Sequence, residues 1–243
     1  MQQHTSEAEY LRTYDPTAFD RPSVAVDVVL LAPRDGGLCT VLALRDEHPD
    51  KGRWAVPGGF VRMDESLDAA AQRVLRDKAG LRGIFLEQLY TFGAPKRDPR
   101  MRIISVAYYA LVDVSRLKKL SAGATVAQIS VPWSGESGGP VIVHDNRGKA
   151  LPLAFDHAEM IGTAVKRVRG KLDYAPIAFE LLPATFTLHD LQRVHEAVQG
   201  HKLNKDSFRR RVLASGTLEA TGTLEEAVGH RPAALYQRKA PHG

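Results

Sequence analysis

The sequence is poor in cysteine and in long apolar runs. It has one cysteine, Cys39, in 243 residues, which excludes an intrachain disulfide and a zinc site built from several cysteines. No run approaches the roughly 18 apolar residues of a membrane helix, and residues 1–16 lack the apolar core of a signal peptide. A composition of 44% hydrophobic and 25% charged residues excludes a disordered chain. We therefore expect a globular protein in the cytoplasm, with no membrane partner.

Acidic residues become scarce only toward the C-terminus. Residues 1–159 contain 20 Lys+Arg and 20 Asp+Glu, whereas residues 160–243 contain 13 and 8. The last third therefore carries the whole net charge of +5. This asymmetry favours a polyanionic partner for the C-terminal part. A solvated basic surface without a partner is the alternative.

The first two thirds of the sequence predict a sheet with an inserted helix. Branched apolar residues at Pro22–Pro33 and Leu38–Leu44 flank a glycine turn, which is typical of a β-hairpin. A helix is expected over Ser66–Ala79, ended by Gly80. Two strands and the basic loop between them follow, at Ile84–Gly93, Ile103–Val112 and Ala94–Arg102. The segment Ser134–Pro140 is expected to be a flexible surface loop, and no function is assigned to it.

The last third predicts three helices and a hairpin. A helix begins at Asp156, and another runs from Thr187 to Gly200 with capping-box spacing at its start. After a four-residue joint, Asn204–Ser215 forms a helix that is expected to bury three apolar side chains, Phe208, Val212 and Leu213. Two strand-like pieces around a glycine-containing loop complete the chain. This order is typical of a helix-turn-helix followed by a β-wing.

The chain from Gly59 onward resembles the Nudix box, a loop, helix and loop with fixed spacing. Its form is Gly, five residues, Glu, seven residues, then Arg-Glu-apolar-x-Glu-Glu-x-Gly-apolar. The positions that agree, preceded by a typical Pro57-Gly58, are Gly59, Glu65, Arg73, Leu75, Gly80 and Leu81. Six fixed positions at fixed spacing make a specific match. The resemblance implies a Nudix-like α/β/α sandwich with a mixed sheet.

The Nudix box normally brings three carboxylates to one helix face, where they hold Mg²⁺ against a diphosphate. In this sequence those positions are Val74, Asp77 and Lys78. One shortened carboxylate remains and an ammonium replaces another, so attack of water on phosphorus loses its electrostatic support. We expect a retained fold with no metal site, no catalytic residue and no hydrolase activity. Glu65 and Arg73 are expected to brace the loop as a structural pair.

A cleft without its metal ligands still has partners for a nucleoside diphosphate. Guanidinium groups suit phosphate oxygens, and the basic loop is rich in them. The candidate ligand-binding residues are Arg53, Lys96, Arg97, Arg100 and Arg102. The alternative is a solvated loop whose arginines bind nothing.

The second helix of the expected helix-turn-helix has the residues that DNA recognition requires. Lysine and arginine side chains bind the DNA phosphates, and the paired N–H donors of arginine form hydrogen bonds with guanine edges in the major groove. The candidate DNA-binding residues are Lys202, Lys205, Ser207, Arg209, Arg210 and Arg211, with Arg231 in the wing. The alternative is a solvated helix face, in which Asp206 pairs with Arg210 at i+4.

The combination of a degenerate Nudix box and a winged helix-turn-helix resembles the NrtR family, the Nudix-related transcriptional regulators of NAD metabolism. Beyond the box, the similar segments are Glu87–Gly93, Arg97–Val112, Leu153–His157, Phe186–Val198 and Lys202–Val212. The likeness extends over nearly the whole chain. It implies an α+β protein with a polar leader (1–20), a Nudix-like effector-sensing domain (21–155), a linking helix (156–173) and a winged helix-turn-helix DNA-binding domain (174–243).

The resemblance also implies a function. NrtR-like proteins are homodimeric repressors that bind a palindromic operator in double-stranded DNA upstream of NAD biosynthesis or salvage genes. Their Nudix domain senses an NAD-derived nucleotide such as ADP-ribose, and no cofactor is required. Dimerisation is also expected because one short recognition helix contacts few base pairs. Two alternatives stay open, an active ADP-ribose or nucleoside-diphosphate pyrophosphatase and a Nudix-related regulator of sugar catabolism.

Overall fold

The computed structural model describes residues 6–172, 174–226 and 231–240. Within them, an eight-stranded mixed sheet is built around β1 (Ser23–Arg34), which pairs antiparallel with β2 (Gly37–Leu44) and parallel with β6 (Ile103–Leu111). The other strands of this sheet are β3 (Trp54–Ala55), β4 (Gly58–Phe60), β5 (Phe85–Phe92), β7 (Ala124–Ser130) and β8 (Ile142–His144). The main order is β5-β6-β1-β2-β7-β8, with β3 beside β2 and β4 beside β1. The predicted β1–β2 hairpin is confirmed.

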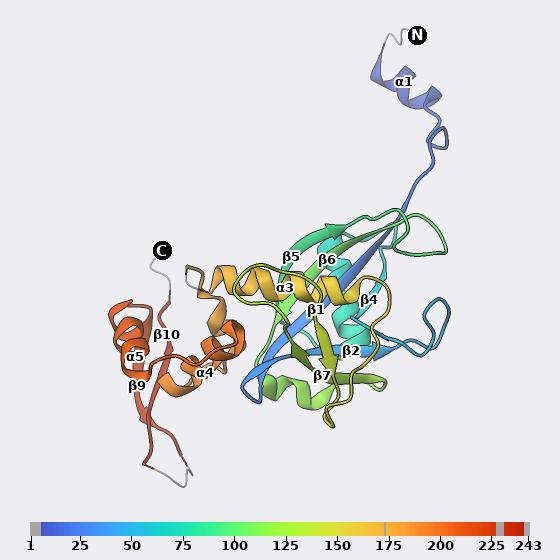
Figure 1. Cartoon of the computed structure of the whole chain (residues 1–243). Helices are drawn as coiled ribbons and strands as arrows, with labels where there is room; N and C mark the ends of the chain where they lie inside the picture. Colours follow the sequence, from blue (N-terminus) through green and yellow to red (C-terminus); the bar gives the residue numbers. More distant parts are fainter. Residues whose placement is uncertain (1–5, 173, 227–230, 241–243) are drawn as a thin grey trace.

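The helices lie at the N-terminus, on the two faces of the sheet and in a C-terminal module (Figure 1). They are α1 (Glu7–Thr13), α2 (Leu67–Val74), α3 (His157–Lys171), α4 (Leu188–Gln199) and α5 (Lys205–Ala214), with shorter segments η1 (Leu75–Ala79), η2 (Val114–Lys119) and η3 (Pro176–Leu181). Among the described residues, none of these helices combines the length and apolar character needed to span a bilayer.

The central strand β1 supplies two cores because successive side chains of a strand point to opposite faces of the sheet. Val28 and Leu30 pack with α2 and η1 on one face. Val29 and Leu31 pack with α3 on the other. Helices therefore cover both faces of a mixed sheet, which confirms the α/β/α sandwich expected from the Nudix box.

The predicted helix over Ser66–Ala79 is present, but its last turn is wider than an α-helix. Ser66 caps the start, with its Oγ accepting a hydrogen bond from the Ala69 amide at 3.2 Å. Gly80 ends the helix in the left-handed conformation, at φ 75°. The turn between them, η1, is π-helical, a form that occurs often at functional sites. Asp77 and Lys78 lie on this widened turn.

The C-terminal module contains the two predicted helices and the wing. Thr187 and Asp190 form the capping box of α4, and Gly200 ends the helix at φ 78°. The Asn204 side chain accepts a hydrogen bond from the Ser207 amide at 3.0 Å and caps α5. Strands β9 (Leu218–Leu224) and β10 (Ala234–Arg238) pair antiparallel as the wing. The winged helix fold is confirmed.

One apolar core runs from the sheet into this C-terminal module. The cluster on the α3 side of the sheet continues without interruption through Leu181, Leu191 and Val198 to Phe208 and Val212 of α5. Helix α4 also lies close to β1 and β2. The sheet and the two helices of the module therefore share one continuous apolar core.

Several local expectations differ from the structure. Leu213 is 47% exposed, because it lies on the side of α5 away from the core, and the prediction that it is buried is wrong. The polar leader contains α1, which has no buried residue. Strands β7 and β8 were not predicted, since the segment of β7 mixes polar and apolar residues. The Ser134–Pro140 segment is a surface loop, as expected, but it also packs on α3, where a Cβ at Gly162 would lie 1.9 Å from the Gly139 carbonyl oxygen.

Candidate effector cleft and nucleic-acid interface

The glycines of the box let the chain pass close to the sheet. A Cβ on Gly58 would lie 2.0 Å from Asp27 Oδ1, so this position has no room for a side chain. The amide of Val56, just before this turn, donates a hydrogen bond of 3.1 Å to Nδ1 of His157 in α3. The turn is therefore tied to β1 on one side and to α3 on the other.

Glu65 and Arg73 form the structural pair of the box. Arg73 Nε donates to Glu65 Oε2 at 2.8 Å, and Arg73 Nη2 also donates to the Phe60 carbonyl at 3.0 Å. Glu65 Oε1 accepts the Arg62 amide at 2.9 Å. Hydrogen bonding from Arg73 lowers the pKa of Glu65 to about 2, so the carboxylate stays ionised at neutral pH. The pair thus connects α2 with the loop that precedes it.

The three positions that would hold Mg²⁺ do not fit a metal ion. Val74 is 1% exposed and packs in the core on the α2 side of the sheet. Asp77 is hydrogen-bonded by the neighbouring Arg76 at 2.7 Å. Lys78 is the member of the three that lines the cleft. Within the described part of the chain, no group of three or more His, Cys, Asp or Glu residues is placed to hold a metal.

The box borders a cleft of about 350 Å³ between the sheet, the glycine turn and the start of α3. Its wall includes Asp27, whose carboxylate accepts a hydrogen bond from Ser105. Arg97 Nη2 lies 3.9 Å from Asp27 Oδ2. The Arg97 guanidinium also forms a bidentate ion pair with Asp156, the residue before α3. Burial alone would lower the pKa of the Arg97 guanidinium, but the hydrogen bonds to Asp156 and the charges of the nearby carboxylates outweigh it and leave this pKa raised. The group is therefore a permanent cation in the cleft wall.

The predicted ligand-binding residues are divided by the structure. Arg97 and Arg100 line the cleft, and each already has a carboxylate partner, Asp156 and Asp98 respectively. Lys96 borders a shallower hollow next to the cleft. The remaining two are bound to backbone oxygens and do not line the cleft: Arg102 donates to the Gly93 carbonyl at 2.7 Å, and Arg53 to the Leu153 carbonyl at 3.3 Å.

Sequence reasoning missed several residues of the cleft wall. The Arg45 guanidinium lies 4.8 Å from the centre of the Phe155 ring, and both residues line the cleft with His157. Phe155 has a left-handed backbone, at φ 49°, which is uncommon for a bulky residue and is found at functional sites. Phe155 and His157 belong to the Leu153–His157 segment, so the family resemblance was the signal that could have identified them.

The joint between α4 and α5 is organised by Glu196. Its Oε1 accepts the Leu203 amide at 3.0 Å, and its Oε2 accepts Lys202 Nζ at 3.0 Å. The hydrogen bond from the Leu203 amide, with those from Gln192 and Lys202, lowers the pKa of Glu196 to about 2. Lys202 therefore carries a partner within the joint, although its side chain is 87% exposed.

The basic residues of α5 fall on different faces of the helix. Successive residues turn by about 100°. Because Phe208 and Val212 face the core, Arg210 points away from it, while Arg209 and Arg211 flank the core on opposite sides. The alternative of a solvated helix face included an ion pair between Asp206 and Arg210. Among the residues that the structure describes, these two side chains form no ion pair. Lys205 and Ser207 are exposed near the start of α5.

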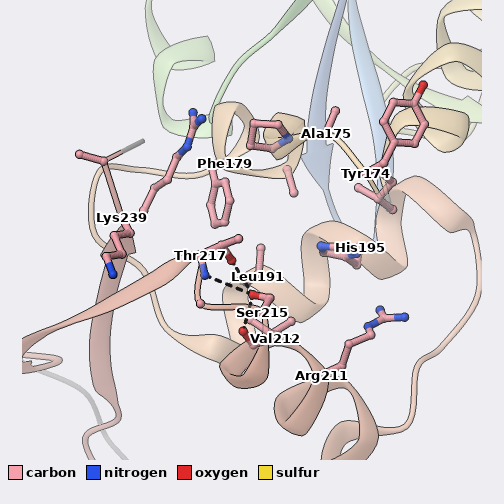
Figure 2. A pocket seen from close by; sticks show the side chains of 16 residues that line it. Tyr174, Ala175, Phe179, Leu191, His195, Arg211, Val212, Ser215, Thr217 and Lys239 are labelled. Atoms are coloured by element: carbon pink, nitrogen blue, oxygen red, sulfur yellow. Dashed lines mark hydrogen bonds between the residues drawn. The ribbon is translucent and has the colours of Figure 1, made fainter. Parts of the chain in front are cut away.

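Arg211 lines a second pocket, of about 680 Å³, between α5 and the segment that follows α3. Figure 2 shows Arg211 bordering this pocket on the side opposite Lys239. Its guanidinium lies 5.7 Å from the centre of the Phe208 ring. Arg209, in contrast, borders a small hollow beside β10. Arg231 is exposed and precedes β10 in the wing.

Comparisons with known proteins agree with both halves of this arrangement. Residues 178–237 match the NrtR DNA-binding winged helix domain, and residues 21–133 match the NUDIX domain. The chain is 34% identical over 235 residues, 96% of its length and 88% of the relative's, to the ADPR responsive transcriptional repressor NtrR of Acinetobacter baylyi.

Two solved structures of Shewanella oneidensis NrtR are also similar. The protein complexed with a 27mer DNA has a TM-score of 0.70 and 32% identity, covering 89% of this chain and 93% of that chain. Its NUDIX domain complexed with ADP ribose has a TM-score of 0.52 and 32% identity, covering 68% of this chain and 99% of that chain.

Proposed function

This chain belongs to the NrtR family, and on that premise we propose that it is a transcriptional repressor whose Nudix domain binds ADP-ribose as an effector. The observation that carries the proposal is the joining of a winged helix to a Nudix cleft whose metal-binding positions are occupied by Val74 and Lys78. A hydrolase would need carboxylates at these positions. A sensor needs only a cleft that recognises the ligand.

The cleft supports recognition of a diphosphate. Arg97 and Arg100 present guanidinium groups in its wall, and Lys78 adds an ammonium where the Nudix box has a glutamate. Cations form strong charge-assisted hydrogen bonds with phosphate oxygens. Arg97 and Arg100 have carboxylate partners in the free protein, and we propose that they exchange or share these partners when the ligand binds. Lys96 is proposed to contribute from the neighbouring hollow.

The C-terminal module is proposed to bind a palindromic operator as part of a homodimer, in the cytoplasm. We assign the groove-facing role to Lys205, Ser207, Arg209 and Arg210, because they lie on the exposed part of α5 or beside the wing. Lys202, Arg211 and Arg231 are proposed to contact the DNA backbone. The proposed target genes are those of NAD biosynthesis or salvage.

A fluorescence-anisotropy titration tests this proposal. Labelled upstream regions of the genome's own NAD genes are titrated with the protein, with and without ADP-ribose, against an excess of unrelated DNA. We expect tight binding that ADP-ribose weakens. Specific binding that ADP-ribose leaves unchanged would exclude this effector, and specific binding only to sugar-operon regions would support the sugar-catabolism regulator instead.

A further inference from the structure

Helix α3 spans the distance between the cleft and the DNA-binding module. Its first residue, His157, accepts the Val56 amide of the glycine turn, and Asp156 before it is held by Arg97. With 15 residues, the helix is about 22 Å long at about 1.5 Å per residue. Figure 1 shows it lying across the sheet and leading toward the C-terminal module. One rigid element thus touches both sites.

At the far end of α3, Arg169 joins three segments of the chain. Its Nε donates to the Val198 carbonyl of α4 at 2.8 Å, and its Nη1 donates to the Gly135 carbonyl at 3.0 Å. Its guanidinium also lies 4.9 Å from the centre of the Trp133 ring. We call Arg169, Trp133 and the Val198 carbonyl the Arg169 clamp.

The clamp provides a hydrogen-bond donor for a carbonyl at the end of α4 that has no partner within the helix. Carbonyls in the last turn of an α-helix have no partner within the helix, and the negative end of the helix dipole lies there. Val198 is in this last turn of α4, so Arg169 supplies both a hydrogen-bond donor and a positive charge. Helix α4 is the first helix of the helix-turn-helix, and its direction sets that of α5.

The other side of the clamp is fixed by close packing. Trp133 Nε1 donates to the Gly139 carbonyl at 3.1 Å, and this carbonyl leaves no room for a Cβ at Gly162 of α3. A Cβ at Gly200, after α4, would lie 3.0 Å from Arg169 Nη2. The Ser134–Pro140 segment therefore packs on α3, and Arg169 joins it to α4 through its hydrogen bonds to the Gly135 and Val198 carbonyls. Among the described residues, Arg169 has no carboxylate within ion-pair distance, so its hydrogen bonds go to backbone oxygens of the neighbouring segments.

We propose that Arg169 is the positioning residue through which the state of the cleft reaches the DNA-binding helices. The inference rests on the proposed function and deepens it, because it assigns the regulation to one contact. A ligand that draws Arg97 from Asp156 shifts the start of α3, and the clamp transfers that shift to α4. Without the guanidinium, α3 and α4 keep their apolar packing but lose the directional contact. The two sites then bind their ligands independently.

The test compares the ratio of operator dissociation constants with and without ADP-ribose in the wild type, Arg169→Ala and Arg167→Ala. Arg167 is a matched control, since it lies on the same helix but bonds the Leu89 carbonyl of the sheet. For the wild type we expect a ratio of about 5 to 150, the usual range of allosteric coupling. For Arg169→Ala we expect a ratio near 1, with the affinity for the operator alone and the affinity for ADP-ribose alone nearly unchanged. For Arg167→Ala we expect the same ratio as for the wild type.

An Arg169→Ala variant with the wild-type ratio would overturn the proposal. If this variant does not give a cooperative thermal transition, Arg169→Met takes its place, because it keeps a long apolar side chain and removes the guanidinium that bonds the Val198 carbonyl. An unchanged ratio in that variant overturns the proposal equally. If the wild type binds the operator tightly but its ratio is 1, ADP-ribose is not the effector, and the proposed function fails. The proposed role of Arg169 then fails with it, because there is no coupling for Arg169 to transmit. Isothermal titration calorimetry of ADP-ribose separates these outcomes.

Discussion

Arg97 holds Asp156 by two hydrogen bonds, of 2.9 Å from Nε to Oδ2 and 2.7 Å from Nη2 to Oδ1. The pair joins the basic loop of the cleft to the residue immediately before α3. Only 6% of the Arg97 side chain is exposed. In the proposed function, a phosphate that enters the cleft meets a guanidinium that already has a carboxylate partner, and this is the basis of the proposed link between the ligand and α3.

The first prediction concerns the stability that this pair supplies. Arg97→Ala should lower the free energy of unfolding by about 3 kcal/mol, because removing one partner of a buried ion pair leaves the other charge uncompensated. Arg102→Ala, in the same loop, removes a single contact to a backbone oxygen and should cost about 1 kcal/mol. Urea denaturation measures both. Equal losses in the two variants would show that the Asp156 pair does not stabilise the fold.

The second prediction concerns hydrolysis. The wild-type protein with Mg²⁺ and ADP-ribose should turn over far below the usual enzyme range of about 1 to 10³ per second, since Val74 and Lys78 replace two metal ligands. A steady-state assay of AMP release checks this. Turnover within that range would establish the pyrophosphatase and reject the sensor.

The third prediction separates three consecutive arginines of α5. Arg209→Ala and Arg210→Ala should weaken operator binding, by about 1 to 3 kcal/mol where a base contact is lost, and affinity should fall steeply with salt. Arg211→Ala should weaken it less, because this side chain borders the pocket behind the helix. Anisotropy titrations at several salt concentrations measure these differences.

A matched control for these variants is Arg147→Ala, which removes one exposed positive charge from the turn after β8. It should leave operator affinity unchanged. If Arg209→Ala and Arg210→Ala behave like this control, the reading surface lies instead on the wing around Arg231.

The fourth prediction concerns acid stability. The pKa of Glu65 is lowered from its ordinary value of 4.5 to about 2 by Arg73, so its contribution is complete above about pH 4.5 and is lost as the pH falls toward 2. The free energy of unfolding of Glu65→Gln should therefore depend less on pH across this window than that of the wild type. Chemical denaturation at several pH values measures the two slopes, and parallel slopes would contradict the assignment.

Local patterns in the sequence determined much of this protein. The Nudix box, the capping box at Thr187 and the glycine after α4 are short-range signals, and each predicted a helix end that the structure contains. The replacement of metal ligands by Val74 and Lys78 is also visible in the sequence, because it depends on residue type and spacing alone.

Only the tertiary structure decided which charged groups already have partners. Arg97 and Asp156 are 59 residues apart, and Arg169 reaches Val198 across 29. No local pattern relates such positions, since packing of the sheet, α3 and α4 brings them together. The same packing turns Arg211 toward a pocket and leaves Leu213 in solvent. Sequence spacing fixes the order of side chains around a helix, but the surfaces that the helix meets decide which side is buried.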